Sequence, residues 1–342
     1  MIKSSSQIKT ASKRTAAKCT FYPFYTIADE LTQVKTLIEK ELLDCSKTVR
    51  GLVGHISLKK GKMLRPGLVL LSGHSIGDVT DKHILAAAII EMIHNATLLH
   101  DDVIDEGKSR RGLPTLNYLK GNESAVLIGD FLLSRVFRMC IELDDDVAKV
   151  IAKSAAKTCE GEINQTAQRG NWLLSESQYL EIITDKSASI FSAACRAGAM
   201  LAGAGKQQQK QLADYGLNVG IAFQITDDIL DLVGSEAKTG KKTGNDLDRD
   251  KLTLPLIHLL KTAPPADREL IKRIIIQQKT SKSNPGEPGL LEKLRACGGL
   301  DYAAKHAKKC VNKAILALDG LKKSKYKETL VETAKFIADR VS

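Results

Sequence analysis

Residues 85–105 read LAAAIIEMIHNATLLHDDVID, an almost unbroken apolar run of helical length that ends in a cluster of aspartates. Apolar side chains occupy more faces of this segment than the single stripe of a surface helix requires. We therefore expect a helix at the centre of a bundle, with Asp101, Asp102 and Asp105 at its end. The stretch predicts the core of the fold and places a group of carboxylates beside it.

Several further segments show apolar residues at helical spacing, and none shows the alternation that is typical of a β-strand. They are residues 27–43, 124–143, 145–168, 176–203 and 206–234, and two more amphipathic helices are expected after residue 298. The loops between them are rich in Gly, Pro and polar residues, and they fall at residues 107–117, 234–246 and 282–289. No loop is long enough to mark a linker between domains. The sequence therefore predicts one all-α domain, a helix bundle over residues 29–342.

The composition agrees with a helical protein that buries a large core. The chain has 342 residues, of which 43% are hydrophobic and 4% aromatic, and Ala, Leu, Ile and Lys are abundant. No window approaches the roughly 18 uninterrupted apolar residues that a membrane-spanning helix needs. We expect a soluble protein without a transmembrane segment.

The net charge is +11, and residues 1–28 contain five basic residues and no Asp or Glu. We predict that residues 1–28 form a basic, flexible N-terminal arm, and the alternative is a segment that targets the protein to an organelle. The remaining positive charge fits an anionic ligand. Because no nucleic-acid motif or aromatic-basic pattern is present, we expect no nucleic-acid partner, although a purely electrostatic nucleic-acid binder stays an alternative.

The seven cysteines are dispersed, odd in number and never arranged as a CxxC pair. This pattern argues against a disulfide framework and against a zinc cluster. It favours a reducing compartment, and we expect the protein to be cytoplasmic.

A second aspartate cluster repeats the pattern far downstream, in FQITDDILD at residues 223–231. Both clusters are DDxxD, so their first and last carboxylates share one helix face, where like charges repel. Mg²⁺ relieves such repulsion, and it is usually bound by a few carboxylates together with substrate phosphates. The alternative is a solvated helix end, which is what we expect of the acidic run Asp144–Asp146. Two matched clusters, each followed by a basic loop, favour the metal site.

Groups that suit phosphate accompany both clusters. Arg110 and Arg111 follow the first cluster in a Gly-bounded loop, and Arg is suited to bidentate contact with phosphate oxygens. His94, two helical turns before the first cluster, and Gln224, just before the second, are placed to donate hydrogen bonds to phosphate. The other candidate cations are Lys62, Arg65, Lys186 and Lys241. Taken alone, each of these residues is more often an ordinary surface or core residue. Their occurrence next to the aspartate clusters is what indicates a phosphate ligand.

Motifs of covalent and nucleotide-binding enzymes are missing from the sequence. It has no GxSxG, no HExxH, no P-loop and no GxGxxG after a strand. Metal and basic side chains without a protein nucleophile indicate chemistry on a diphosphate, with Mg²⁺ as Lewis acid and Arg and Lys stabilising the charge that develops.

From about residue 30 to the C-terminus, the chain resembles the trans-type (E) polyprenyl diphosphate synthases, the isoprenoid chain-elongating prenyltransferases. The motifs that carry the resemblance come in the family's order and spacing, and they are GKMLRP, HNATLLHDDVIDEGKSRRG, GDFLLSR, DKSA, FQITDDILD, GK at residues 240–241 and NDLDRDKLTLP. Lys60 and Asp250 stand where the family commonly has glycine. Since the lysines after them are kept, we expect altered loops and retained activity.

The resemblance implies an all-α bundle around a deep central cavity, usually a homodimer. It implies Mg²⁺-dependent condensation of isopentenyl diphosphate with an allylic diphosphate, with about two to three ions in each site. The implied metal ligands are Asp101, Asp105 and Asp227. The two motifs would be completed by Asp102, Asp228 and Asp231.

The resemblance also divides the phosphate-binding side chains between the two substrates. The allylic diphosphate would be held by Arg110, Lys186, Gln224 and Lys241, and Lys186 would also assist catalysis. Ser187 would be a further substrate-binding residue. The isopentenyl diphosphate would be held by Lys62, Arg65, His94 and Arg111. Lys251 is a further implied phosphate contact.

Product length is expected to depend on Ile93, Ala96 and Thr97, which precede the first motif on its helix. In short-chain members of the family a bulky aromatic at the second or third of these positions closes the pocket, whereas both residues are small here. We predict an all-trans product longer than C15, about C30–C50 and of the quinone side-chain kind, with peripheral membrane association during product release. Geranylgeranyl diphosphate is the alternative product.

Two other readings stay open. A terpene cyclase shares a helical fold and an aspartate motif, but it usually has a single DDxxD and many aromatic residues. A non-catalytic partner subunit typically lacks one of the two motifs, whereas both motifs are intact in this chain.

Overall fold

The computed structural model describes residues 23–55, 61–110, 112–233, 244–279 and 289–340. The helices in chain order are η2 (Phe24–Ile27), α2 (Ala28–Leu43), α3 (Lys47–Val53), α4 (Leu64–His74), α5 (Asp81–Ile104), α6 (Leu116–Lys120), α7 (Asn122–Cys140), α8 (Asp145–Ala167), α9 (Glu176–Ile183), η4 (Thr184–Ala188), α10 (Ser189–Leu201), α11 (Lys206–Val233), α13 (Asn245–Asp248), α14 (Leu254–Thr262), α15 (Pro265–Lys279), α16 (Leu290–Ala296), α17 (Gly299–Ala317) and α18 (Lys325–Asp339). The predicted all-α fold is confirmed. No helix among the described residues is long and apolar enough to cross a membrane.

Helix α5 lies at the centre of the bundle, as its apolar sequence predicts. It packs against α2, α4, α7 and α10, and Ala86, Ile89 and Ile90 have no exposed surface. His83 caps the N-terminus of α5, because its Nδ1 accepts a hydrogen bond from the backbone N–H of Thr80 at 3.0 Å. The first aspartate motif therefore lies at the carboxyl end of a helix whose preceding turns are packed in the core.

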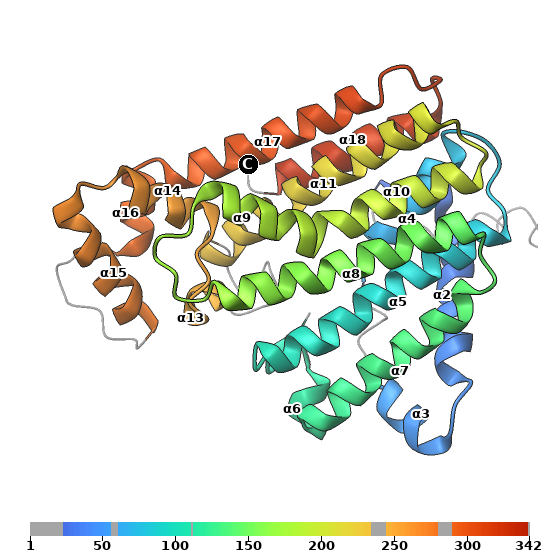
Figure 1. Ribbon diagram of the computed structural model, residues 1–342, viewed down its shortest axis with the longest axis horizontal. Coiled ribbons are helices and arrows are strands. Elements are labelled where there is room, and N and C mark those ends of the chain that lie inside the picture. Colours follow the sequence, from blue (N-terminus) through green and yellow to red (C-terminus); the bar gives the residue numbers. More distant parts are fainter. Residues whose placement is uncertain (1–22, 56–60, 111, 234–243, 280–288, 341–342) are drawn as a thin grey trace, which may run out of the picture.

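The long helices lie side by side, and several of them end at the same place. Contacts run from α8 to α10, from α10 to α11 and from α11 to α17. The carboxyl ends of α5, α8 and α11 point to one end of the bundle, next to the smaller group formed by α13 to α16 (Figure 1). Both aspartate motifs therefore lie at this end.

Helices α10 and α11 approach closely because small residues face the contact. A Cβ atom on Gly216 or Gly220 of α11 would overlap atoms of α10 or of the turn before it. The same holds for Gly198 of α10, where a Cβ would overlap the backbone of α4. These glycines fix the spacing of the layers that carry the second motif.

The region that reads as one helix, residues 176–203, is interrupted by a π-helical turn, η4. The turn packs against α8, where a Cβ on Gly161 would overlap the backbone N of Lys186. Such turns often occur at functional sites, because the extra residue redirects the side chains that follow. This turn is not predictable from the sequence, because the apolar pattern continues through it.

Smaller departures from expectation occur at the loop after α5 and near the N-terminus. Residues expected to form only a loop include a two-stranded hairpin, β1 (Ser109–Arg110) with β2 (Leu113–Pro114), paired Ser109 to Pro114 and Arg110 to Leu113. The packed part of the chain begins before residue 29, because Phe24 and Ile27 are fully buried. The acidic run Asp144–Asp146 lies at the turn between α7 and α8 and is exposed, as predicted.

Candidate active site

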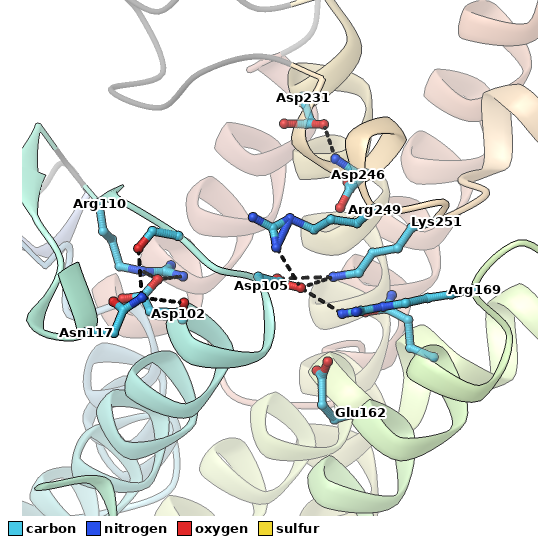
Figure 2. A network of polar contacts seen from close by, with 12 residues as sticks. Asp102, Asp105, Arg110, Asn117, Glu162, Arg169, Asp231, Asp246, Arg249 and Lys251 are labelled. Carbon is cyan, nitrogen blue, oxygen red and sulfur yellow. Dashed lines mark hydrogen bonds and ion pairs between the residues drawn. The ribbon is translucent and has the colours of Figure 1, made fainter. Parts of the chain in front are cut away.

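The two aspartate motifs face one another across groups supplied by α8, η4 and the segment after α13. Figure 2 shows Asp105 at the end of α5 and Asp231 near the end of α11, with Arg249 and Lys251 between them. Asp101 and Asp102 belong to the last turns of α5, and Asp105 caps the helix. The second motif lies in the last two turns of α11.

Asp102 holds the hairpin that follows α5. It is almost fully buried, and Arg110 donates to its Oδ1 through Nε at 2.8 Å and through a terminal nitrogen at 2.7 Å. Asn117 donates to the carbonyls of Asp102 and Gly107 at 3.0 and 3.1 Å. The middle aspartate of the first motif therefore positions Arg110, a predicted diphosphate contact.

Asp101 lies among other carboxylates and next to Lys186. Burial raises the pKa of Asp101 to about 6, with a further contribution from Glu162, while Lys186 opposes the rise. Lys186 donates to Gln165 Oε1 at 2.8 Å and forms an ion pair with Glu162. Burial disfavours its charge, but Asp101 and Glu162 outweigh this and raise the pKa of the Lys186 ammonium.

Asp105 is surrounded by three cations. Arg169 approaches its Oδ1 at 2.9 Å, Arg249 at 3.2 Å and the Lys251 ammonium at 3.1 Å. Burial alone would raise the pKa of the Asp105 carboxyl, but Lys251 and Arg249 hold it below its ordinary value. Lys251 itself is buried, with 6% of its side chain exposed. Figure 2 shows the three basic side chains converging on this one carboxylate.

The middle aspartate of the second motif has neutral partners. Tyr179 donates its hydroxyl to Asp228 Oδ2 at 2.6 Å, and Gln224 donates its amide to Oδ1 at 2.7 Å. Ser187 in turn donates to Gln224 Oε1 at 2.6 Å. Burial raises the pKa of Asp228 well above its ordinary value, and the nearby carboxylate of Asp246 adds to this. The π-helical turn thus connects both motifs, through Lys186 to the first and through Ser187 to the second.

The outer aspartates of the second motif have separate partners. Arg340, at the end of α18, pairs with Asp227 at 2.8 Å. Asp231 accepts the backbone N–H of Asp246 at 3.0 Å. Burial raises the pKa of Asp246 to about 6, and Asp231 adds to the effect. Asp227 and Asp231 share a helix face, as expected, but contact different segments of the chain.

The remaining predicted contacts lie on α4, α5 and the segment before α4. The Lys62 ammonium lies 5.6 Å from the ring centroid of Phe336 on α18, and the Arg65 guanidinium lies 4.6 Å from that of Phe191 on α10. His94 is half-buried on α5. Arg111 and Lys241 lie outside the described residues.

The three predicted chain-length residues differ in exposure. Ile93 and Ala96 are buried, with 3% and 0% of their surface exposed. Thr97 is half-buried and donates its hydroxyl to the carbonyl of His94 at 2.8 Å. His94, Thr97 and Asp101 therefore form a partly accessible stripe along α5.

The carboxylates of the two aspartate motifs suit Mg²⁺, but an ion there would need substrate phosphates or water as further ligands. Among the described residues, no three Asp, Glu, His or Cys side chains are grouped closely enough to hold a metal. Asp101 and Glu162 are nevertheless incompletely neutralised, since burial raises the pKa of Asp101 and Glu162 Oε1 is buried without a hydrogen-bond partner. Mg²⁺ commonly takes one or two carboxylates and completes its shell with substrate phosphates and water. The donor set therefore fits a Mg²⁺–diphosphate complex.

Several residues of this site were not predicted from the sequence. They are Glu162, Gln165, Arg169, Tyr179, Asp246, Arg249 and Arg340. A signal existed for the first three, because they are three and four residues apart, with Glu162 and Gln165 on one face of α8 and Arg169 in the turn that follows it. Arg340 carried no signal, since nothing in the last residues of the chain indicates a return to the site.

Comparison with known proteins gives one consistent result. A family model described as polyprenyl synthetase matches residues 46–286. The octaprenyl diphosphate synthase of Escherichia coli (strain K12) is 35% identical over 314 residues, which are 92% of this chain and 96% of that protein.

Solved structures show the same likeness. A decaprenyl diphosphate synthase from Rhodobacter capsulatus has a TM-score of 0.84 and 35% identity, covering 93% of this chain and 98% of that one. A polyprenyl synthase from Caulobacter crescentus CB15, complexed with calcium and isoprenyl diphosphate, has a TM-score of 0.85 and 31% identity, covering 93% of this chain and 96% of that one.

Proposed function

The chain belongs to the polyprenyl synthetase family, and on that premise we propose that it elongates prenyl chains at the end of the bundle where the two aspartate motifs meet. As a polyprenyl diphosphate synthase, it condenses isopentenyl diphosphate with an allylic diphosphate to give an all-trans polyprenyl diphosphate. The main evidence for this location is that the π-helical turn links the two motifs. Lys186 interacts with Asp101 of the first motif, and Ser187 donates a hydrogen bond to Gln224 next to the second.

A divalent metal, which the family requires, would neutralise the diphosphate and promote its departure as a leaving group. We propose that the metal is Mg²⁺, with about two to three ions in each site. The residues that would hold it are Asp101, Asp105 and Asp227. The solved relative complexed with calcium and isoprenyl diphosphate supports a site that takes a divalent ion together with a diphosphate.

The protein's own residues hold the substrates and stabilise the charge on the leaving group. In the reaction, the bond between the allylic carbon and the diphosphate oxygen breaks, and the diphosphate keeps the electron pair. The double bond of isopentenyl diphosphate then attacks the allylic cation, and the released diphosphate takes the proton that the product loses. Lys186, whose charged form is stabilised by its neighbours, is placed to balance the negative charge that develops on the diphosphate. The other proposed allylic contacts are Arg110, Ser187, Gln224 and Lys241.

The isopentenyl diphosphate would lie on the other side of the site. Lys62 lies over Phe336 of α18, and Arg65 lies over Phe191 of α10. His94 belongs to the partly accessible stripe of α5 that leads to Asp101. Arg111 would complete this group. The protein has cations for two diphosphates, which is what a condensation of two diphosphate substrates needs.

We propose a product of about C30–C50, because α5 carries small residues before the first motif and the compared relatives include octaprenyl and decaprenyl enzymes. Geranylgeranyl diphosphate is the less favoured product. Peripheral membrane association during release and a cytoplasmic location stay predictions.

A second copy of the chain is the proposed partner. Helix α7 and the residue that caps it expose large apolar side chains, Leu127, Phe137 and Ile141, which are 65%, 70% and 83% exposed. Exposed apolar surfaces of this kind mark protein interfaces. Light scattering should give twice the monomer mass of 37.2 kDa, and a monomer mass would contradict the proposal.

The function is tested by incubating the protein with Mg²⁺, labelled isopentenyl diphosphate and each allylic primer in turn, and by sizing the products. The expected result is Mg²⁺-dependent incorporation into chains of about C30–C50. Absence of elongation with every primer would refute the proposal, and a discrete peak near C20 would overturn the product length.

Two variants test the pocket in the same assay. Ala96→Phe should shorten the product, because the added ring fills the path of the tail, whereas Thr97→Ser should leave the length unchanged. A product distribution of Ala96→Phe identical to that of the unmodified protein would contradict this assignment of the pocket.

A further inference from the structure

The cations around Asp105 exceed what a single carboxylate can balance. Arg169, Arg249 and Lys251 all lie within 3.2 Å of its Oδ1, and the three come from two segments far apart in the sequence. The carboxylate of Asp246 also interacts with Lys251, but two carboxylates against three cations still leave the cluster with positive charge for another partner. Glu162 on α8 forms its ion pair with Lys186.

The backbone brings the three cations to one point. Gly170 donates its N–H to the carbonyl of Asp250 at 2.9 Å, which joins the end of α8 to the segment after α13. Lys251 donates its N–H to the carbonyl of Asp246 at 2.9 Å and closes the turn. Asp250, between the two cations of that segment, has a φ of 58°, which a non-glycine residue rarely adopts. Strain of this kind persists where the surrounding structure requires it, and it is frequent at functional sites.

Arg169 also has an unused donor that points to a missing ligand. Its Nε is buried and has no hydrogen-bond partner, although a terminal nitrogen of the same guanidinium contacts Asp105. A buried N–H without an acceptor is unfavourable, so such groups usually bind an additional molecule or ion. An anionic oxygen next to Asp105 would satisfy it.

We propose that Arg169 and Arg249 hold Asp105 in the metal-free enzyme and move to the diphosphate when Mg²⁺ and diphosphate bind together, while Lys251 keeps its contact with Asp105. This inference rests on the proposed function, and it adds two arginines to the predicted contacts. Arg169 and Arg249 are 27% and 20% exposed, so both are accessible from the site and can change partners without unpacking the core. Lys251, more deeply buried, would stay in place.

The consequence is that the metal and the diphosphate bind cooperatively. Mg²⁺ alone must displace positive side chains from Asp105 and enter a region that is already positive, so it binds weakly. The diphosphate brings the negative charge that re-pairs the arginines and at the same time supplies oxygen ligands to the metal. Coupling between two ligands of this kind typically changes their affinities by about 5- to 150-fold.

Calorimetric titration of the full chain separates the two parts of the proposal. Mg²⁺ alone is titrated first, and inorganic diphosphate is then titrated in the presence of Mg²⁺. In the Arg169→Gln/Arg249→Gln double variant, Mg²⁺ alone should bind about 5- to 10-fold more tightly, because Asp105 is released, and diphosphate with Mg²⁺ should bind about 10-fold more weakly. Arg249→Lys, which keeps the charge and loses the fork geometry, should lie between the two.

The matched control is Arg50→Gln, since Arg50 is an exposed arginine on α3 that donates to the carbonyl of Leu43 at 2.8 Å, away from the site. It should leave both titrations unchanged. If the double variant does not fold, Arg249→Gln alone gives the same test with a smaller shift. An unchanged or weakened affinity for Mg²⁺ alone overturns the proposal, and so does an unchanged affinity for diphosphate.

These titrations do not depend on turnover. A protein that shows the opposite shifts but no incorporation of isopentenyl diphosphate would refute the proposed function and keep the role of the arginines. A protein that elongates prenyl chains but shows no opposite shifts would keep the function and refute this inference.

Discussion

The middle aspartates of the two DDxxD motifs, Asp102 and Asp228, have opposite surroundings although their sequence patterns match. Asp102 forms a charged pair with Arg110, whereas Asp228, which is buried to a similar extent, accepts hydrogen bonds from a tyrosine and a glutamine. The pair with Arg110 ties down a hairpin at the edge of the site, and the neutral network ties α11 to α9 and η4. One motif therefore anchors a cation at the edge of the site, and the other anchors the packing of α9, η4 and α11.

The motifs differ in the same way at their outer positions. Around the first motif, three cations converge on Asp105, while around the second the outer carboxylates contact one arginine and one backbone N–H. Identical residue types thus acquire different electrostatic environments from the segments that fold onto them. The comparison predicts which substitutions damage chemistry and which damage the fold.

The largest effect is expected when a proposed metal ligand is removed from either motif. Asp101→Ala and Asp227→Ala should each lower kcat/KM for isopentenyl diphosphate by about 10³-fold or more, because a metal ligand supplies several kcal/mol of transition-state stabilisation. Steady-state incorporation of labelled substrate measures this. Full activity in one of the two variants would show that the aspartate replaced in that variant is not a metal ligand.

Helix α8 should tolerate no added methyl group where it packs against the π-helical turn η4. Gly161→Ala should destabilise the protein by about 3 kcal/mol and lower activity, because its Cβ would displace the backbone of Lys186 and thereby both contacts of the π-helical turn. Urea unfolding and the incorporation assay measure the two effects. The control is Gly51→Ala in α3, where nothing lies within 4 Å of the added atom and a slight stabilisation is expected. Equal behaviour of the two variants would show that the close approach at Gly161 is unimportant.

The two middle aspartates should differ in stability when each is made neutral. Asp102→Asn should lower the free energy of unfolding by about 2–3 kcal/mol, because Arg110 loses a charged partner. Asp228→Asn should cost about 1 kcal/mol, because its carbonyl oxygen still accepts the hydroxyl of Tyr179. Denaturant midpoints at one protein concentration test the difference. The reverse order would contradict the prediction that the charged pair stabilises the fold more than the neutral hydrogen bonds do.

The smallest effect concerns pH and the second motif. The folded-state pKa of Asp246, about 6, is raised above the unfolded value of about 4. The folded protein therefore holds this proton more tightly, and stability from this group is complete below pH 4 and lost as the pH rises through 6. Without metal, Asp246→Asn should be more stable than the unmodified protein by on the order of 1 kcal/mol at pH 8, and equal to it near pH 4. Unfolding measured across this range checks the sign, and a variant that is less stable at pH 8 contradicts it.

The sequence by itself determined the all-α class, the central position of α5, the two aspartate motifs and the family. Each of these follows from local information, because helical periodicity, apolar content and the spacing of carboxylates are properties of contiguous residues. The exposure of the acidic run Asp144–Asp146 was predictable for the same reason.

Only the tertiary structure decided how each carboxylate is neutralised. The contacts of Asp105 with Arg169 and Arg249, and of Asp227 with Arg340, join residues that lie far apart in the chain. The π-helical turn depends on the close approach of Gly161, which belongs to a different helix. The charge state and the partner of a buried group depend on what packs against it in three dimensions, and the spacing of residues along the chain contains no record of that packing.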